Sequence, residues 1–212
     1  GCGTGKWAAK LIKSGYEVTC VDISHLMLER ARVKIEKGVG TRGRFVQADL
    51  CDLSELPPNR FALATAMGDP IGCANKPAVA LKEIRRILAP HGHLVATFDN
   101  RLAAIDFYLE KGKPQTLAKF LRDGRTYWLT KDADERFEIT TYGPKALRRL
   151  LDTAGFEVLE VIGKTILPMR HHRNLLESTE SRREWMRIEK TLCRDEAAIG
   201  RASHLQVACR KR

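Results

Sequence analysis

Short runs of apolar and β-branched residues alternate along the chain with stretches in which apolar residues recur every three or four positions. The first pattern predicts buried strands, and the second predicts amphipathic helices. Strands are predicted at residues 16–21, 44–48, 61–67, 94–98, 156–162 and 203–209, and helices at 6–14, 24–38, 77–88 and 144–154. Because strands and helices alternate, the pattern predicts an α/β fold built on a doubly wound sheet.

The most informative polar segment is the glycine turn Gly1-Cys2-Gly3-Thr4-Gly5, directly before the first predicted helix. Glycine at every second position lets the backbone approach a ligand closely, because no side chain obstructs it and positive φ costs little. The free N–H groups at the helix start then favour an anion. Dinucleotides and S-adenosylmethionine both bind to such turns. The spacing G-x-G-x-G favours the second, since the dinucleotide fingerprint is G-x-G-x-x-G.

Two acids follow predicted strands. Asp22 ends the strand at 16–21, and Asp49 follows the strand at 44–48. A carboxylate at the tip of such a strand offers two acceptor oxygens to the two hydroxyls of a ribose. Together with the glycine turn, these acids form a more specific pattern than the glycines alone.

At this point the chain resembles the class I S-adenosylmethionine-dependent methyltransferases. The resemblance rests on GCGTG at 1–5, VDIS at 21–24, QADL at 47–50, EIRRILAPHGHLVATF at 83–98 and LLDTAGFEVLEVIG at 150–163. It implies that the glycines hold the methionine end of the donor, Asp22 the ribose, and Asp49 the adenine amino group, with Ile23 packed on the adenine and Leu50 offering its backbone. The full implied donor site is Gly1, Cys2, Gly3, Gly5, Asp22, Ile23, Ala48, Asp49, Leu50 and Met67.

The resemblance also implies a Rossmann-like sheet whose last two strands add an antiparallel pair. The family's first strand precedes the glycine turn, so we expect that strand to be missing from the sequence given, as in an N-terminally truncated chain. The 212 residues otherwise read as one domain, 1–212.

Residues 99–143 are too long for a simple connection, and they hold aromatic residues and a predicted hairpin at 125–129 and 136–140. Insertions above the carboxyl edge of such a sheet often select the ligand. We therefore expect a substrate cap, with Tyr108, Tyr127 and Trp128 as contacts to the acceptor. The alternative is that these aromatic side chains give the insertion its own core.

Methyl transfer from a sulfonium needs a base only when the acceptor must lose a proton. The candidates are Asp69, Asp99 and His171. Each has a structural alternative: a turn at Asp69-Pro70, a helix cap at Asp99-Asn100, and surface exposure for the histidine.

Charge and composition narrow the function further. The net charge is +11, but the basic residues are spread along the chain and interleaved with acids, so nucleic acid is not the expected partner. No apolar run approaches the roughly 20 residues of a membrane span. Six cysteines without a C-x-x-C pair predict no metal site and suit a reducing cytoplasmic setting.

Three function classes remain. A methyltransferase acting on a small molecule, at oxygen, carbon or nitrogen, is the expected one. An RNA or protein methyltransferase would be favoured by a localised basic groove beside the donor site. A binding module without activity is the third. The oligomeric state stays open.

Overall fold

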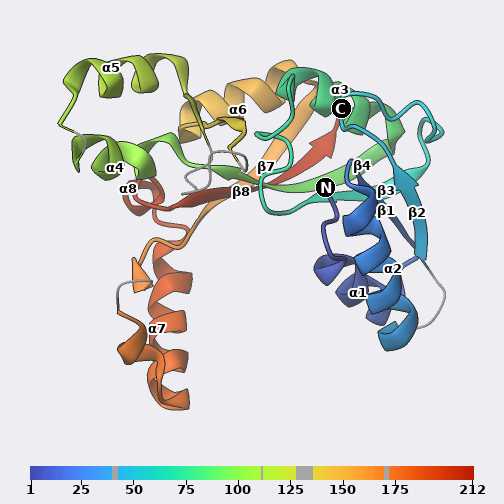
Figure 1. Cartoon of the computed structure of the whole chain (residues 1–212), viewed down its shortest axis with the longest axis horizontal. Coiled ribbons are helices and arrows are strands. Elements are labelled where there is room, and N and C mark those ends of the chain that lie inside the picture. Colours follow the sequence, from blue (N-terminus) through green and yellow to red (C-terminus); the bar gives the residue numbers. More distant parts are fainter. Residues whose placement is uncertain (40–42, 111, 128–135, 170–171) are drawn as a thin grey trace.

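The structure, a computed structural model, describes residues 1–39, 43–110, 112–127, 136–169 and 172–212. Within these residues the strands form three sheets (Figure 1). A parallel pair joins β1 (Val18–Asp22) to β2 (Gly43–Gln47), and an antiparallel pair joins β5 (Arg125–Tyr127) to β6 (Glu138–Thr140). The largest sheet has the order β3-β4-β8-β7 and contains β3 (Phe61–Ala66), β4 (Leu88–Asp99), β7 (Phe156–Lys164) and β8 (His204–Lys211).

The largest sheet mixes strand directions. β3 is parallel to β4, whereas β8 is antiparallel to both of its neighbours, β4 and β7. The α/β class and the antiparallel pair near the end of the chain are therefore confirmed.

A single continuous sheet is not formed by the described residues, because β1 and β3 are each the last strand of a separate sheet. The expected strand ahead of the glycine turn stays a prediction.

β4 begins earlier than the sequence pattern predicts. Helix α3 spans Pro77–Ile87, and β4 starts at the next residue, whereas the segment Pro90-His91-Gly92-His93 predicts a turn ahead of the strand at 94–98. The pairing with β3 jumps from Phe61 opposite Leu88 to Leu63 opposite His93, so the residues between bulge out of the ladder. A Cβ on Gly92 would lie 2.9 Å from the carbonyl oxygen of Ala89. The expected turn is thus an irregularity within a longer strand.

Helices lie on both sides of the strands (Figure 1). α1 (Lys6–Lys13) and α2 (His25–Val39) contact β1 on one side. α3 contacts β4, and α6 (Pro144–Thr153) contacts β7, on the other side. The Ser24 hydroxyl accepts the Met27 N–H at 3.3 Å and so caps the start of α2.

One hydrophobic core joins the β1–β2 pair to the β3-β4-β8-β7 sheet. Its members come from β2, β4, β7, β8 and the helices above them, and its fully buried side chains include Leu81, Leu94, Phe98, Leu147, Phe156 and Leu205. Burying a side chain of this size contributes about 1.5–3 kcal/mol. A second cluster holds α1 and α2 against β1 and consists of Ala8, Ile12, Cys20, Leu28 and Ile35.

The insertion contains η1 (Arg101–Ala104), α4 (Ile105–Glu110), α5 (Pro114–Asp123) and the β5–β6 pair. The predicted hairpin is confirmed for its described part, and residues 128–135 lie outside the described residues. The Tyr108 ring stacks on Phe120 with centroids 4.6 Å apart, and its hydroxyl lies 2.6 Å from the Thr126 hydroxyl. The insertion therefore has a small core of its own.

Between β7 and β8 lie η3 (Arg173–Leu176), α7 (Thr179–Leu192) and α8 (Glu196–Ile199). α7 extends away from the sheet, and none of its residues is buried (Figure 1). Among the helices that the structure describes, none has the length and apolar character needed to cross a membrane.

Candidate functional site

The glycine turn is fastened to the end of β1 by the Asp22 carboxylate. The Gly3 N–H donates to Oδ2 at 2.7 Å, and the Ser24 N–H donates to Oδ1 at 3.0 Å. The Cys2 N–H donates to the carbonyl of Val21 at 2.8 Å. Because a carboxylate oxygen has two lone pairs, each Asp22 oxygen keeps capacity for one more donor.

The turn is tightly packed at its ends and open in its middle. A Cβ on Gly1 would collide with Pro70, and a Cβ on Gly5 would lie 3.0 Å from the Ala31 Cβ. Nothing lies within 4 Å of the Cβ position of Gly3, where φ is +53°. The positive φ at this position favours glycine. The absence of a side chain on Gly3 leaves space above the turn for a ligand.

A cavity of about 540 Å³ opens on the side predicted to hold adenine. Ile23, Ala48 and Asp49 line it, together with Phe45, Val46, Gln47 and Glu55. Ile23 is 67% exposed, so its side chain is available to cover a flat ring. The structure thus brings three of the predicted donor residues together, whereas the cavity includes neither Asp22 nor the glycine turn.

The other predicted donor residues lie nearby in the fold without lining this cavity. Leu50 packs against the main core and Cys2 against the second cluster. Met67 directly follows β3 and is partly buried.

Asp69, a predicted base candidate, is only 3% exposed and has both oxygens occupied. Oδ1 accepts the Gly72 N–H at 2.9 Å, and Oδ2 accepts the Asp99 N–H at 2.9 Å. Burial raises the pKa of Asp69 to about 8. The carboxyl therefore joins the loop after β3 to the end of β4, as the turn alternative implied.

Asp99 lies beside a residue that sequence reasoning missed. Its Oδ1 is 3.3 Å from Nε2 of His204, the first residue of β8. Burial raises the pKa of Asp99, and His204 opposes the shift. The neighbouring Asn100 caps η1, because its Oδ1 accepts the Leu102 N–H at 3.2 Å. The cap expected at this position is therefore formed by Asn100, and the Asp99 side chain faces His204.

The remaining candidates differ in their placement. His171 and Trp128 lie outside the described residues. Tyr108 is 8% exposed inside the core of the insertion, whereas Tyr127 is 60% exposed. The described residues contain no group of three or more His, Cys, Asp or Glu side chains that could hold a metal ion.

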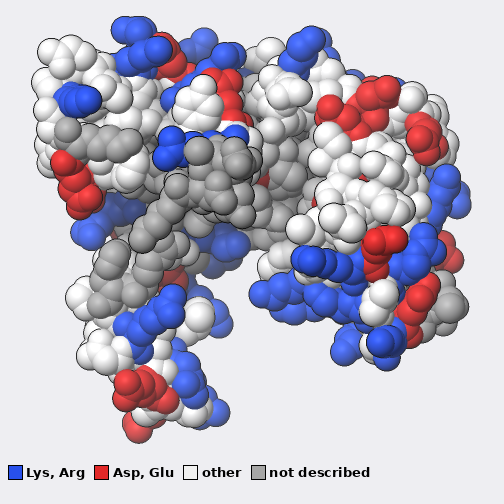
Figure 2. Space-filling view, viewed as in Figure 1, with Lys and Arg blue, Asp and Glu red and all other residues white. Residues whose placement is uncertain are grey.

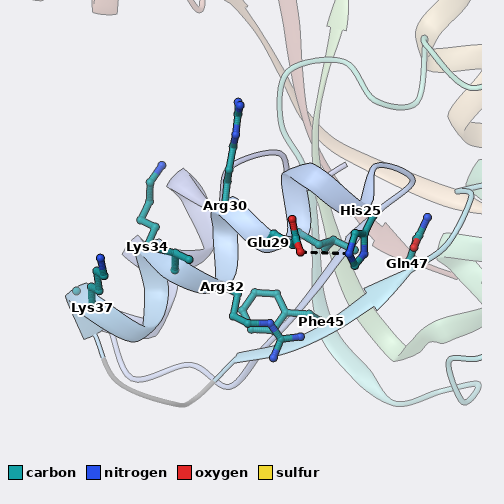
Figure 3. Close-up of a pocket in the computed structure, with 11 residues that line it drawn as sticks. His25, Glu29, Arg30, Arg32, Lys34, Lys37, Phe45 and Gln47 are labelled. Atoms are coloured by element: carbon teal, nitrogen blue, oxygen red, sulfur yellow. Dashed lines mark ion pairs between the residues drawn. The ribbon is translucent and has the colours of Figure 1, made fainter.

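A larger, basic cavity of about 1060 Å³ lies on α2 and β2 (Figure 3). Its cationic residues are Arg30, Arg32, Lys34 and Lys37, and the Arg32 guanidinium lies 4.7 Å from the centre of the Phe45 ring. Figure 2 shows Lys and Arg side chains gathered over α1 and α2, at the lower right of the view.

Known proteins resemble this chain in sequence and in fold. Residues 1–92 match the family model described as a methyltransferase domain. The chain is 30% identical over 123 residues to the uncharacterized methyltransferase YodH of Bacillus subtilis, which covers 58% of this chain and 48% of YodH. It is 25% identical over 181 residues to a ubiquinone biosynthesis O-methyltransferase of Xanthomonas euvesicatoria, covering 85% of this chain and 70% of that protein. The chain thus spans about half the length of YodH.

Solved structures share the fold over the whole chain. A methyltransferase of Methanosarcina mazei that uses S-adenosylmethionine superposes with a TM-score of 0.66 at 18% identity, covering 100% of this chain and 89% of that one. A Burkholderia thailandensis 1,6-didemethyltoxoflavin-N1-methyltransferase with bound S-adenosylhomocysteine gives 0.59 at 17% identity, covering 100% and 68%. Residues 1–92 thus match a methyltransferase domain, and the whole chain shares the fold of solved S-adenosylmethionine-dependent methyltransferases.

The residue that sequence reasoning missed, His204, comes from a strand at the opposite end of the chain. His204 reaches the end of β4 only because β8 runs antiparallel to β4, which pairs Asp99 with His204. The prediction of an antiparallel final pair was the available signal, since the first residue of an antiparallel strand lies at the carboxyl end of the strand with which it pairs.

The buried Asp69 carboxyl should make the stability of the methyltransferase fold depend on pH. Its pKa rises from 3.8 to about 8 on folding, so between these values the folded state binds a proton that the unfolded state releases. The free energy of unfolding should therefore fall as pH rises from 4 to 8, by at most about 1.4 kcal/mol per pH unit. Asp69→Asn should remove this slope in urea unfolding at pH 5 and 8, whereas the exposed Asp106→Asn should keep it. An unchanged slope in Asp69→Asn would show that the carboxyl is ionised in the fold.

Proposed function

We propose that the protein transfers a methyl group from S-adenosylmethionine to a small-molecule acceptor. The observation that carries the proposal is the glycine turn, open above Gly3 and fixed by Asp22 next to the cavity of Ile23, Ala48 and Asp49. The structural relative with a bound small-molecule acceptor supports the choice of acceptor class. The methylated atom, whether oxygen, carbon or nitrogen, is not fixed by these observations.

The residues of the turn fit the donor. The space above Gly3 would take the methionine end, since a side chain there would fill it and oppose the positive φ. Asp22 would accept the ribose hydroxyls with its remaining lone pairs. In the cavity, Ile23 and Ala48 would pack on adenine and Asp49 would accept from its amino group. Gly1, Gly5, Cys2, Leu50 and Met67 complete the proposed donor site.

The donor supplies an already activated methyl group on a sulfonium. The protein therefore has to align the acceptor with it and exclude water. We propose that residues 99–143 do this as a cap within a single domain, 1–212, with Tyr127 rather than the buried Tyr108 facing the acceptor. We also propose that the β1–β2 pair and the β3-β4-β8-β7 sheet are two parts of one Rossmann-like, doubly wound layer, because they share one core. A cytoplasmic location completes the proposal.

Donor binding should depend on Asp22. Asp22→Asn should weaken S-adenosylhomocysteine by roughly 1.5–3 kcal/mol in calorimetry, because a charged acceptor is lost from the ribose hydroxyls. The exposed Asp152→Asn on α6 should bind like the unaltered protein. S-adenosylhomocysteine should also raise the melting temperature by mass action, more than NAD does. Unchanged affinity in Asp22→Asn would remove this residue from the site, and a larger shift with NAD would contradict the proposed function.

The cap can be tested separately from the donor site. Tyr127→Ala should leave the affinity for S-adenosylhomocysteine unchanged and reduce transfer from labelled donor into a bacterial metabolite extract. Tyr16→Ala alters another exposed tyrosine, just before β1, and should change neither. Equal loss of donor affinity and transfer in Tyr127→Ala would place the insertion in the donor site instead.

RNA is the second candidate acceptor, and a specific surface favours it. Three cations on α1 and three on α2 each recur at i, i+4 and i+7, which places each set along one helix face: Lys6, Lys10 and Lys13, and Arg30, Lys34 and Lys37. Lys34 Nζ lies 3.0 Å from the Thr4 hydroxyl, so the second set reaches the glycine turn. Phosphate contacts need such a basic face. The sequence did not predict this face, because its basic residues are spread along the chain.

Charge reversal tests whether RNA binds to this surface or responds only to the net charge of the protein. A Lys10→Glu, Lys34→Glu variant should weaken a fluorescein-labelled single-stranded RNA 20-mer by roughly tenfold or more in anisotropy at low salt. The Arg148→Glu, Arg149→Glu variant makes the same change in net charge on α6 and should bind as the unaltered protein does. If both variants behave alike, or no RNA binds, RNA is excluded as the acceptor.

A further inference from the structure

A polar pair of side chains lies at the carboxyl end of β4 in the largest sheet. β4 ends at Asp99, and β8 begins opposite it at His204. Ligands of open α/β sheets bind at the carboxyl ends of the strands. Nε2 of His204 is 3.3 Å from Oδ1 of Asp99, while no hydrogen bond to its Nδ1 occurs within the described part of the chain.

Neighbouring backbone holds both residues in place. The Asp99 N–H donates to Asp69, and the Asp99 carbonyl accepts the Tyr142 N–H at 3.1 Å. His204 pairs with Asp99 on one side and with Lys164 of β7 on the other. A pair placed on strands in this way is pre-organised, which is what catalytic groups require.

The side chains of Asp99 and His204 differ in exposure. This difference is the one expected of an orienting carboxylate and a more accessible base. The Asp99 side chain is 23% exposed and the His204 side chain 45% exposed, so the imidazole is the member that a ligand can reach. Asp69 is excluded as the base because it is buried and both of its oxygens accept backbone N–H groups. A mostly covered carboxylate beside an accessible imidazole can hold the ring and stabilise its protonated form.

A continuous set of contacts links this pair to the donor turn. Gly1 packs on Pro70, the adjoining Asp69 binds the Asp99 backbone, and Asp99 faces His204. An acceptor above the end of β4 would therefore lie between the turn and the imidazole.

We propose that His204 is the general base of the reaction, that Asp99 is its positioning residue, and that the acceptor presents an aromatic hydroxyl. The proposal rests on the methyltransferase function proposed above. Of the acceptors considered, a neutral hydroxyl must lose its proton to become a good nucleophile. A phenol, with a pKa of about 10, lies within reach of an imidazole, whose ordinary value is about 6.5.

The step conserves atoms and charge. The acceptor O–H gives its proton to Nδ1 of His204 while an oxygen electron pair forms the new bond to the methyl carbon. The bond between that carbon and the sulfonium sulfur breaks, and its electron pair stays on sulfur, which yields neutral S-adenosylhomocysteine. The imidazolium then releases its proton to water.

The test uses the full chain with labelled S-adenosylmethionine and three phenol probes: catechol, caffeate and 4-hydroxybenzoate. His204→Ala should lower kcat for the preferred probe by about 100-fold or more and leave the affinity for S-adenosylhomocysteine unchanged. Added imidazole should restore part of the lost kcat, because it replaces the missing base. His93→Ala removes an exposed histidine that pairs with Arg210, toward the other end of β8, and should keep full activity.

The positioning role of Asp99 is tested by separate variants. Asp99→Asn should lower kcat with little change in KM for the donor, and Asp99→Glu should recover part of the loss because it restores a carboxylate beside the ring. Unchanged kcat in His204→Ala, or a loss that imidazole does not restore, would overturn the role of His204. A protein that binds S-adenosylhomocysteine but methylates 2-phenylethylamine and none of the phenols would overturn the acceptor class. A protein that does not bind S-adenosylhomocysteine would contradict the proposed function itself.

Discussion

The glycine turn depends on one carboxylate, that of Asp22, which accepts the Gly3 N–H ahead of β1 and the Ser24 N–H after it. Without this acceptor the Gly3 and Ser24 N–H groups would lose a charged partner, at about 1.5–3 kcal/mol for each bond. The same carboxylate fixes where α1 starts. The packing of Ala8 and Ile12 against Leu28 and Ile35 then follows from that starting point.

Asp69 plays the corresponding part at the other side of the site. It also follows a strand, and it also accepts two backbone N–H groups, but its deeper burial favours the neutral form. The loops that carry the chemistry are thus shaped by acids that first satisfy the backbone. An acid at the end of a strand in this fold can bind backbone N–H groups as well as a ligand. The hydrogen-bond partners of each carboxylate oxygen distinguish these two roles.

Local sequence predicted much of the fold and the position of the acids at the strand ends. Runs of β-branched residues predicted the strands, and Asp22 and Asp49 stood out as the acids that follow two of them. Both signals act within a few residues of sequence. The placement of His204 opposite Asp99 depends on the register of β8. The gathering of two cation sets depends on how α1 packs on α2. Neither is encoded in a local pattern. Tyr108 shows the same limit, since only tertiary packing places its ring on Phe120.

The break between β1 and β3 has a consequence for how the two groups of elements are joined. Within the described residues, the α1–β1–α2–β2 unit is joined to the larger sheet by side-chain packing and by the Arg86 guanidinium, which donates to the carbonyls of Leu53 and Leu56, rather than by a strand ladder. Side-chain packing and these hydrogen bonds therefore carry the contact between the two groups of elements in the described residues. A molecule that touched both Asp22 and the loop at Pro70 would add a further link between them.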